Sequence, residues 1–196
     1  MAKHQTSRDR QAAATKGRIY RCGVRLMNRY GYDHVTVGQI AEKAGVSVGT
    51  FYHHFKSKLD LLGEVFRQGD AYFTEYVPRL MRDPMRCAQR IEEYFARYAA
   101  LALQNGLEMV RSLYVPTNRM FLTHGRAMQD LLTEILRIGQ QGGEVTPEPD
   151  AAQITEMLFV VARGVIFDWC LHDGQTDLAA QMRDTTGRYA RSFLLR

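Results

Sequence analysis

The sequence predicts an all-α protein of about nine helices, and three observations carry this prediction. Apolar residues recur at intervals of three and four along most of the chain, which places them on one face of a helix. No segment sustains the alternation of apolar and polar residues that a half-buried strand would show. Glycine and proline gather at a few places that separate the periodic segments from one another.

Residues 1–14 are polar and basic, and we expect a flexible arm there. The first helix is expected over residues 15–30, because Ile19, Leu26 and Met27 recur along it at helical spacing. This helix would therefore pack one apolar face against the segment that follows it.

Residues 36–58 predict two short helices joined by a tight turn. Thr36 is a favourable N-cap, and Gln39 can complete a capping box with it. Gly45 stands where the first of these helices ends, and glycine readily takes the left-handed backbone that such ends require. Ser47 can cap the second helix in turn. The segment is therefore a candidate helix-turn-helix.

The second short helix would hold a polar outer face above two inward phenylalanines, Phe51 and Phe55. Its outer residues are small or carry hydroxyl or imidazole groups, and they are Val48, Gly49, Thr50, Tyr52, His53 and His54. Such a surface can enter the major groove and meet base edges and phosphates. Lys58 follows, close to where a phosphate backbone would pass.

This run resembles the DNA-binding domain of TetR-family (TetR/AcrR-like) transcriptional regulators. The resemblance covers roughly residues 15–62 and rests on the combined spacing of several short pieces. These pieces are Gly31-Tyr32, Thr36-Val37, Ile40-Ala41, Ala44-Gly45-Val46-Ser47, Gly49-Thr50, Phe51-Tyr52, His54-Phe55 and Lys58. The resemblance implies DNA contacts from Thr36, Ser47, Lys58 and the outer face of the second helix, with His54 on a phosphate.

The first helix departs from the family pattern at two positions. Gly23 and Met27 stand where the family usually has alanine and phenylalanine. Gly23 should cost up to about 1 kcal/mol of helix propensity relative to alanine. Both positions bear on the packing of the first helix and neither on the DNA-reading surface.

The rest of the chain reads as a series of amphipathic helices. They are expected over residues 58–80, 85–104, 107–114, 118–141, 150–172 and 175–195. The family layout implies that residues 63–196 form a helical ligand-binding and dimerisation domain. With the arm at residues 1–14 and the helix-turn-helix domain at residues 15–62, this makes three parts.

The last two helices are candidates for a dimer interface. Their apolar stripes consist of Ile154, Leu158, Val161, Val165 and Trp169 in one helix, and of Leu178, Met182 and Tyr189 in the other. Two adjacent amphipathic helices can pair with their copies in a second subunit to form a four-helix bundle, which is how TetR-like proteins dimerise. The alternative is that both stripes face their own subunit's core.

Family resemblance also implies a ligand pocket in this part of the chain. The candidate residues are aromatic, methionine or polar, and they are Tyr72, Tyr76, Tyr98, Met109, Asn118, Phe121, Met128, Arg163 and Phe167. Aromatic and methionine side chains suit a large, adaptable apolar ligand, although at helical spacing each one can equally be plain core. Arg163 and Asp168 lie in a mostly apolar stretch and could serve as a buried pair, a dimer contact or a ligand clamp.

Charge is unevenly distributed along the chain. Residues 1–70 hold 12 Lys and Arg against 6 Asp and Glu, whereas residues 71–196 hold 14 against 15. A basic N-terminal part beside a near-neutral remainder fits a head that faces phosphates.

No apolar core of a signal peptide and no run of about 20 apolar residues is present, so we expect a cytoplasmic protein. Cys22, Cys87 and Cys170 are far apart and form no CxxC pair, and we expect neither a metal site nor a cofactor.

We expect a ligand-responsive transcriptional regulator, most simply a repressor that binds a palindromic operator as a homodimer and is released by a small hydrophobic molecule. A DNA-binding protein controlled by a partner protein, or not controlled at all, is a second interpretation. An enzyme is the third, and no nucleophile elbow, metal-binding spacing or phosphate-binding glycine loop supports it.

Overall fold

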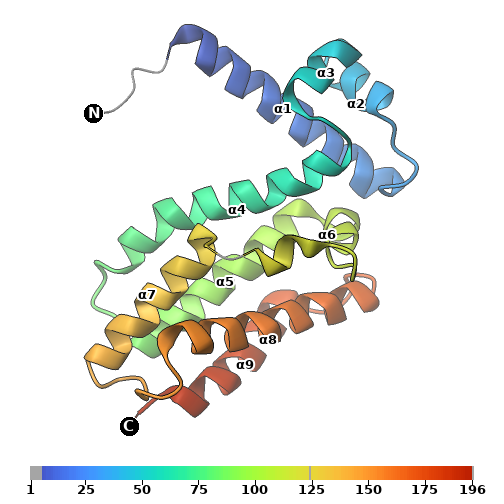
Figure 1. The fold of residues 1–196 in the computed structure, drawn as a ribbon. Helices are drawn as coiled ribbons and strands as arrows, with labels where there is room; N and C mark the ends of the chain where they lie inside the picture. The colour runs from blue at the N-terminus through green and yellow to red at the C-terminus, as the bar shows by residue number, and fades with distance from the viewer. Residues whose placement is uncertain (1–5, 124, 196) are drawn as a thin grey trace. The chain divides into compact units, whose positions relative to one another are not determined.

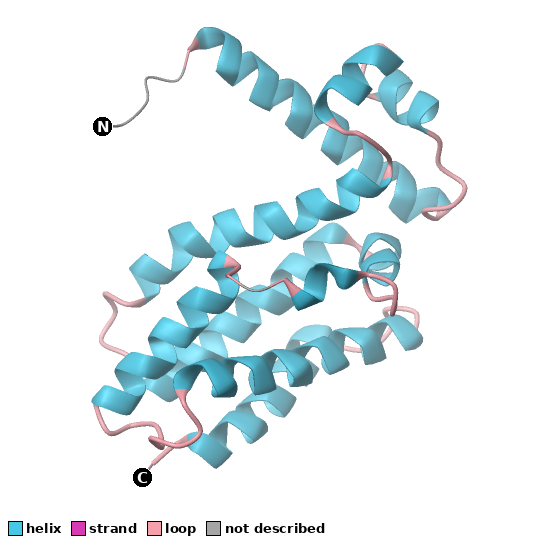
Figure 2. Ribbon diagram, viewed as in Figure 1, coloured by secondary structure: helices cyan, strands magenta, loops and turns pink. Residues whose placement is uncertain are grey.

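The computed structural model describes residues 6–123 and 125–195, and within this part helices joined by loops and turns make up the fold (Figures 1 and 2). The helices are α1 (Ser7–Tyr30), α2 (Val37–Lys43), α3 (Val48–His54), α4 (Leu59–Leu80), α5 (Cys87–Asn105), α6 (Leu107–Leu113), η1 (Arg119–Leu122), α7 (Ala127–Gln141), α8 (Ala151–Leu171), α9 (Leu178–Ala190) and η2 (Arg191–Phe193). The two η segments are single turns of 3-10 helix. The prediction of an all-α fold with about nine helices is confirmed.

The chain divides into two compact units, Met1–Val65 and Phe66–Arg196, and the division falls within α4. In the N-terminal unit, α1 begins at Ser7, so residues 7–14 are helical and the expected arm is wrong for them. The reason is a capping box in which the Thr6 hydroxyl accepts from the Asp9 backbone N–H and the Asp9 carboxylate accepts from the Thr6 backbone N–H. Residues 1–5 of the arm lie outside the described part.

Close packing explains the unusual glycine of α1. A Cβ atom at Gly23 would lie 2.8 Å from Cδ1 of Leu61, a fully buried side chain at the start of α4. The alanine that the family usually has would therefore force Leu61 to move. In this chain Leu61 occupies the volume that a methyl group at position 23 would need, which offsets the propensity cost of glycine.

In the C-terminal unit α5 is the central helix, in contact with α6, α7, α8 and α9. Aromatic side chains from three helices form the middle of its core: Phe73 of α4 lies against Tyr94 of α5, with ring centroids 4.3 Å apart. Phe95 and Tyr98 of α5 contact Phe159 of α8. Helices α8 and α9 run side by side (Figure 1).

The expected helix over residues 118–141 is interrupted in the structure. Only Arg119–Leu122 and Ala127–Gln141 are helical, and Gly125 between them has φ +70°. A left-handed residue cannot continue a right-handed helix, so the chain turns there and α7 starts afresh. None of the described helices is both long and apolar enough to cross a lipid bilayer.

Candidate functional site

Two buried phenylalanines anchor the inner side of helix α3, and a serine caps its N-terminus. Phe51 and Phe55 are fully buried beneath it, with ring centroids 5.6 Å apart. At its N-terminus the Ser47 hydroxyl accepts from the Thr50 backbone N–H at 3.0 Å and lies 2.9 Å from the Thr50 hydroxyl. The helix therefore presents its outer face with little freedom to reorient.

The outer face of α3 carries the residues expected there. Val48, Gly49, Tyr52 and His53 are exposed, whereas Thr50 and His54 are half-buried. A Cβ atom at Gly49 would meet only the Ser47 hydroxyl at an ordinary 3.7 Å, so no contact within the protein demands glycine. Its bare backbone leaves room for close approach of an outside partner.

Thr36 caps α2 in the predicted way. Its hydroxyl accepts from the Gln39 backbone N–H at 3.2 Å, and the Gln39 side chain accepts from the Thr36 backbone N–H at 2.8 Å. Both residues remain exposed. Thr36 is thus available at the surface while it holds the start of the helix.

Lys58 has a structural role that the sequence did not predict. Its ammonium donates to the carbonyl oxygens of Tyr32 at 2.6 Å and of Val35 at 3.0 Å, and it lies 4.1 Å from the centroid of the Tyr32 ring. These contacts hold the loop between α1 and α2, so Lys58 is not a free phosphate contact in this structure. Lys56, two positions earlier, has an exposed side chain.

In the C-terminal unit two tyrosines bring their hydroxyl groups together. Tyr98 of α5 and Tyr114, which follows α6, have hydroxyl oxygens 3.1 Å apart. Burial raises the pKa of both hydroxyls, and the positive charge of Arg163 on α8 opposes this rise at each of them. The candidate pocket residues Tyr98 and Arg163 therefore lie near each other, and Tyr114 joins them without having been predicted.

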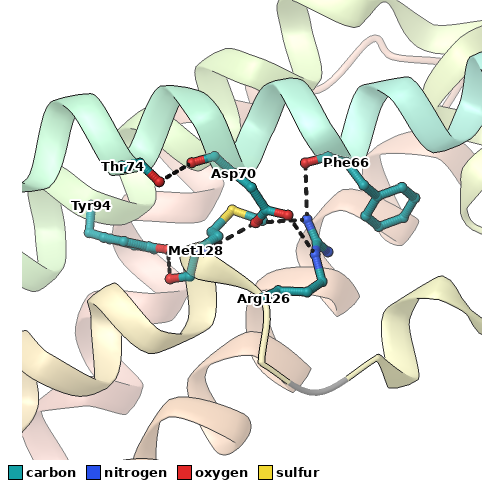
Figure 3. A network of polar contacts seen from close by, with 6 residues as sticks. All are labelled: Phe66, Asp70, Thr74, Tyr94, Arg126 and Met128. Carbon is teal, nitrogen blue, oxygen red and sulfur yellow. Dashed lines mark hydrogen bonds and ion pairs between the residues drawn. The ribbon is translucent and has the colours of Figure 1, made fainter. Parts of the chain in front are cut away.

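A polar network beside this tyrosine pair links α4 to α7 (Figure 3). The Asp70 carboxylate accepts from the Arg126 guanidinium at 3.2 and 3.3 Å and from the Met128 backbone N–H at 3.1 Å. Asp70 thereby caps the N-terminus of α7 from a different helix. The Arg126 guanidinium also lies over the Phe66 ring, 4.5 Å from its centroid, and Tyr94 donates to the Met128 carbonyl at 2.6 Å.

The other candidate pocket residues have mixed outcomes. Met109 and Met128 are buried, and Phe121 contacts both Phe66 and Tyr114. The Asn118 amide donates to the Leu113 carbonyl and accepts from the Met120 backbone N–H, so it caps η1.

Three aromatic candidates lie nearer the surface. Tyr72 and Tyr76 stack on each other, and the Tyr76 hydroxyl donates to Glu93 at 3.2 Å. Phe167 is 47% exposed on the outer face of α8, so its side chain lies apart from the buried pocket candidates.

The predicted dimer residues are mostly core of a single subunit. Six of them have at most 8% exposure, and these are Ile154, Leu158, Val165, Trp169, Leu178 and Met182. Val161 and Tyr189 are half-buried. The hairpin of α8 and α9 thus turns these six side chains inward, and only Val161 and Tyr189 of the predicted stripes keep exposed surface that a second copy could meet.

A second apolar stripe runs along the outer face of α8. Val160, Phe167 and Leu171 are 60%, 47% and 64% exposed. Met157, before them, and Gly164, between Val160 and Phe167, lie on the same face. The spacing 157, 160, 164, 167, 171 alternates three and four, as in a heptad seam. The same spacing is present in the sequence. It does not stand out there, because α8 is apolar on two faces and the two stripes overlap in the pattern.

Asp70, Tyr114 and Arg126 were also missed. Each lies outside an apolar stripe or next to a turn, so helical periodicity does not mark them. Asp168, which the sequence offered as a partner for Arg163, is exposed. Its Oδ2 atom lies 3.5 Å from Nδ1 of His172.

A rigid second helix with an exposed polar face, set in a small three-helix unit, defines the class of helix-turn-helix DNA-binding proteins. Residues 19–65 match the family model of bacterial regulatory proteins, tetR family. Residues 19–65 therefore carry the DNA-binding domain that this family model describes.

Matches to individual proteins extend over most of the chain. The fatty acid metabolism regulator protein of Bacillus subtilis (strain 168) is 25% identical over 168 residues, which cover 83% of this chain and 87% of that protein. The solved structure of the transcriptional regulator FadR from Bacillus subtilis, in complex with stearoyl-CoA, has a TM-score of 0.74 at 22% identity and covers 89% of this chain and 97% of that one.

FadR from Thermus thermophilus, in complex with lauroyl-CoA, has a TM-score of 0.70 at 22% identity, covering 92% of this chain and 96% of that one. At this identity the two structures show a shared fold. The matched proteins are transcriptional regulators and not enzymes, in agreement with the expectation from the sequence.

Proposed function

We propose that the protein is a ligand-responsive repressor that acts in the cytoplasm, binds a palindromic operator as a homodimer and leaves it when a small hydrophobic molecule binds. The observation that carries the DNA-binding part is the outer face of α3. Its exposed Val48, Gly49, Tyr52 and His53 stand over the buried Phe51 and form a surface suited to a major groove.

The proposed effector is an acyl compound. Two proteins of the same fold are named as holding stearoyl-CoA and lauroyl-CoA, and a relative is named as a fatty acid metabolism regulator. In this chain the core of the C-terminal unit is rich in aromatic rings around Tyr98 and Phe159, and apolar surroundings of this kind suit an acyl chain.

The homodimer is proposed on the outer stripe of α8. Exposed Met157, Val160, Phe167 and Leu171 form a continuous apolar surface that a monomer would leave in water. Gly164 in its middle has nothing within 4 Å of a would-be Cβ, which permits a second helix to approach closely. A self-complementary seam of this kind suits a twofold dimer, which in turn suits a palindrome.

The proposed link between effector and DNA runs through α4. This helix contributes Leu61 to the N-terminal unit and Asp70 to the C-terminal unit. The Asp70 carboxylate fixes α4 to the start of α7 through Arg126 and the Met128 N–H. An effector that shifts α7 would therefore act on α4 directly, because the two share these hydrogen bonds.

A single titration tests the proposal. Fluorescence anisotropy of labelled DNA from upstream of the gene would be measured at about 150 mM salt, with random duplex as competitor. We expect specific binding, and release on addition of a long-chain acyl-CoA or the free acid. Linkage requires that saturating operator weakens effector binding by the same factor.

The outcomes separate the interpretations. Specific binding that no acyl compound releases would leave a DNA-binding protein under another control and refute the effector part. Binding no stronger than to random duplex would refute the operator part.

A further inference from the structure

The hydroxyl pair of Tyr98 and Tyr114 contains one O–H group that has no acceptor among the described residues. Two hydroxyls 3.1 Å apart share a single hydrogen bond, in which one donates and the other accepts. The hydrogen of the accepting hydroxyl then has no acceptor among the described residues. The pair is partly buried, with Tyr98 9% exposed and Tyr114 half-buried, and an unmade hydrogen bond is unfavourable wherever water does not reach the donor.

Arg163 places a positive charge near this pair and has no carboxylate partner among the described residues. It is half-buried on α8, one turn after Phe159, whose ring centroid lies 5.6 Å from that of Tyr98. Within the described part of the chain its guanidinium forms neither an ion pair nor a hydrogen bond, while its charge acts on both tyrosine hydroxyls. Asp168 does not neutralise it, because that carboxylate is exposed beside His172.

Nearby Arg126 differs in having its own counter-charge. Its guanidinium is paired with Asp70, with side chains 12% and 25% exposed. Arg163 differs from Arg126 in having no carboxylate partner among the described residues, while its positive charge acts on both tyrosine hydroxyls.

Apolar rings surround these polar groups. Tyr98 contacts Phe95 and Phe159 by its ring edge, and Tyr114 contacts Phe121 at 4.9 Å between centroids. A ligand that satisfies the donor and the charge together must therefore carry an anionic oxygen at the end of an apolar body.

We infer that the hydroxyl pair of Tyr98 and Tyr114, together with Arg163, binds the carboxylate of a free fatty acid. A carboxylate accepts a hydrogen bond from the unused O–H and supplies a negative counter-ion for the Arg163 guanidinium. A thioester carbonyl would accept the hydrogen bond but leave the guanidinium without a counter-ion. This inference rests on the proposed effector response and specifies the chemical form of the effector.

The test is isothermal titration of three ligands of equal chain length: dodecanoate, methyl dodecanoate and dodecanoyl-CoA, at about pH 7.5, where a carboxylic acid is ionised. The variants are Arg163→Met, which removes the charge and keeps an unbranched apolar stem, and Tyr114→Phe, which removes only a hydroxyl. Arg82→Met, at an exposed arginine after α4, is the matched control.

We expect dodecanoate to bind the unmodified protein about tenfold or more tightly than its methyl ester. Arg163→Met should remove most of this ratio by weakening the acid alone, Tyr114→Phe should reduce it, and Arg82→Met should retain it. The conservative tyrosine variant keeps the test valid if Arg163→Met does not fold.

Equal binding of acid and ester, or an unchanged ratio in both site variants, would overturn the inference. Binding of dodecanoyl-CoA without binding of dodecanoate would overturn it and leave the proposed function intact. If none of the three ligands bound, both the carboxylate site and the acyl effector would be refuted.

Discussion

At the residue scale, Lys58 decides how the DNA-binding head is held together. Its ammonium satisfies two carbonyl groups in the loop after α1 and rests on the Tyr32 ring. A lysine so engaged contributes to folding of the unit, whereas the exposed Lys56 is free to meet a phosphate. Neighbouring lysines of the same type therefore have different roles.

Lys58→Met is expected to destabilise the protein by about 1–2 kcal/mol, because two carbonyl groups lose a charged donor. The salt dependence of DNA binding should not change. Lys56→Met should leave stability nearly unaltered and reduce the slope of log K against log salt by about 1. Urea denaturation and anisotropy at several salt concentrations measure these effects, and a reduced slope for Lys58→Met would contradict the assignment.

His54 makes the stability of the protein depend on pH. Burial, and then the nearby charges of His53 and Lys16, lower the pKa of His54 below its ordinary 6.5. The unfolded chain therefore binds this proton more readily than the folded one, so stability is full above about pH 6.5 and is lost as pH falls through the folded pKa.

Denaturation between neutral and mildly acidic pH should show this loss, and His54→Asn should reduce it. His34→Asn, at an exposed histidine, is the control and should behave like the unmodified protein. An identical pH dependence in His54→Asn would show that another group is responsible.

At the scale of elements, α7 begins where it does because α4 supplies its cap. Arg126 occupies the N-cap position without making a side-chain cap bond, and Asp70 accepts the Met128 N–H in its place. The capping interaction thus joins two helices far apart in sequence. A displacement of either helix would disturb the hydrogen bonds that Asp70 makes to the other.

Asp70→Asn should destabilise the protein by about 2 kcal/mol, because Arg126 would remain largely buried without a counter-charge and α7 would lose a charged cap. It should also alter the response of DNA binding to effector. Asp184→Asn, at an exposed pair with Arg188, should cost less than about 0.5 kcal/mol. Thermal unfolding of both variants provides the measurement, and equal small effects would refute the capping role.

At the scale of the whole molecule, the outer face of α8 is the surface on which we propose that two subunits meet. Helix α8 is apolar on two faces: Ile154 and Leu158 fill the core, and Val160 and Leu171 face outward. The packing of the chain buries the first face and leaves the second exposed, and the proposed homodimer would cover the second face.

Val160→Glu is expected to convert a dimer to a monomer, since like charges would meet across a twofold axis in an apolar seam. Val115→Glu, at a half-exposed valine that precedes Pro116, should remain dimeric. Analytical ultracentrifugation distinguishes the two. A dimer that persists in Val160→Glu would place the interface elsewhere, and a monomeric unmodified protein would refute the homodimer.

The sequence by itself determined the local structure and the class of the protein. Capping residues such as Thr36 and Ser47 and the buried pair Phe51 and Phe55 act within a few residues of one another, so their pattern predicts the helix-turn-helix and its outer face. Helical periodicity likewise predicted most of the remaining helices, since one apolar face is enough to require burial.

Only the tertiary structure decided which face of α8 is core, what Lys58 bonds and which polar groups gather around Tyr98. These outcomes depend on contacts between residues far apart in the chain: Lys58 meets Tyr32, Asp70 meets Arg126, and Tyr98 meets Tyr114. Periodicity reports that a helix has an apolar face but not which neighbour covers it. A helix that is apolar all round, or a polar residue beside a turn, therefore acquires its role only when the helices pack.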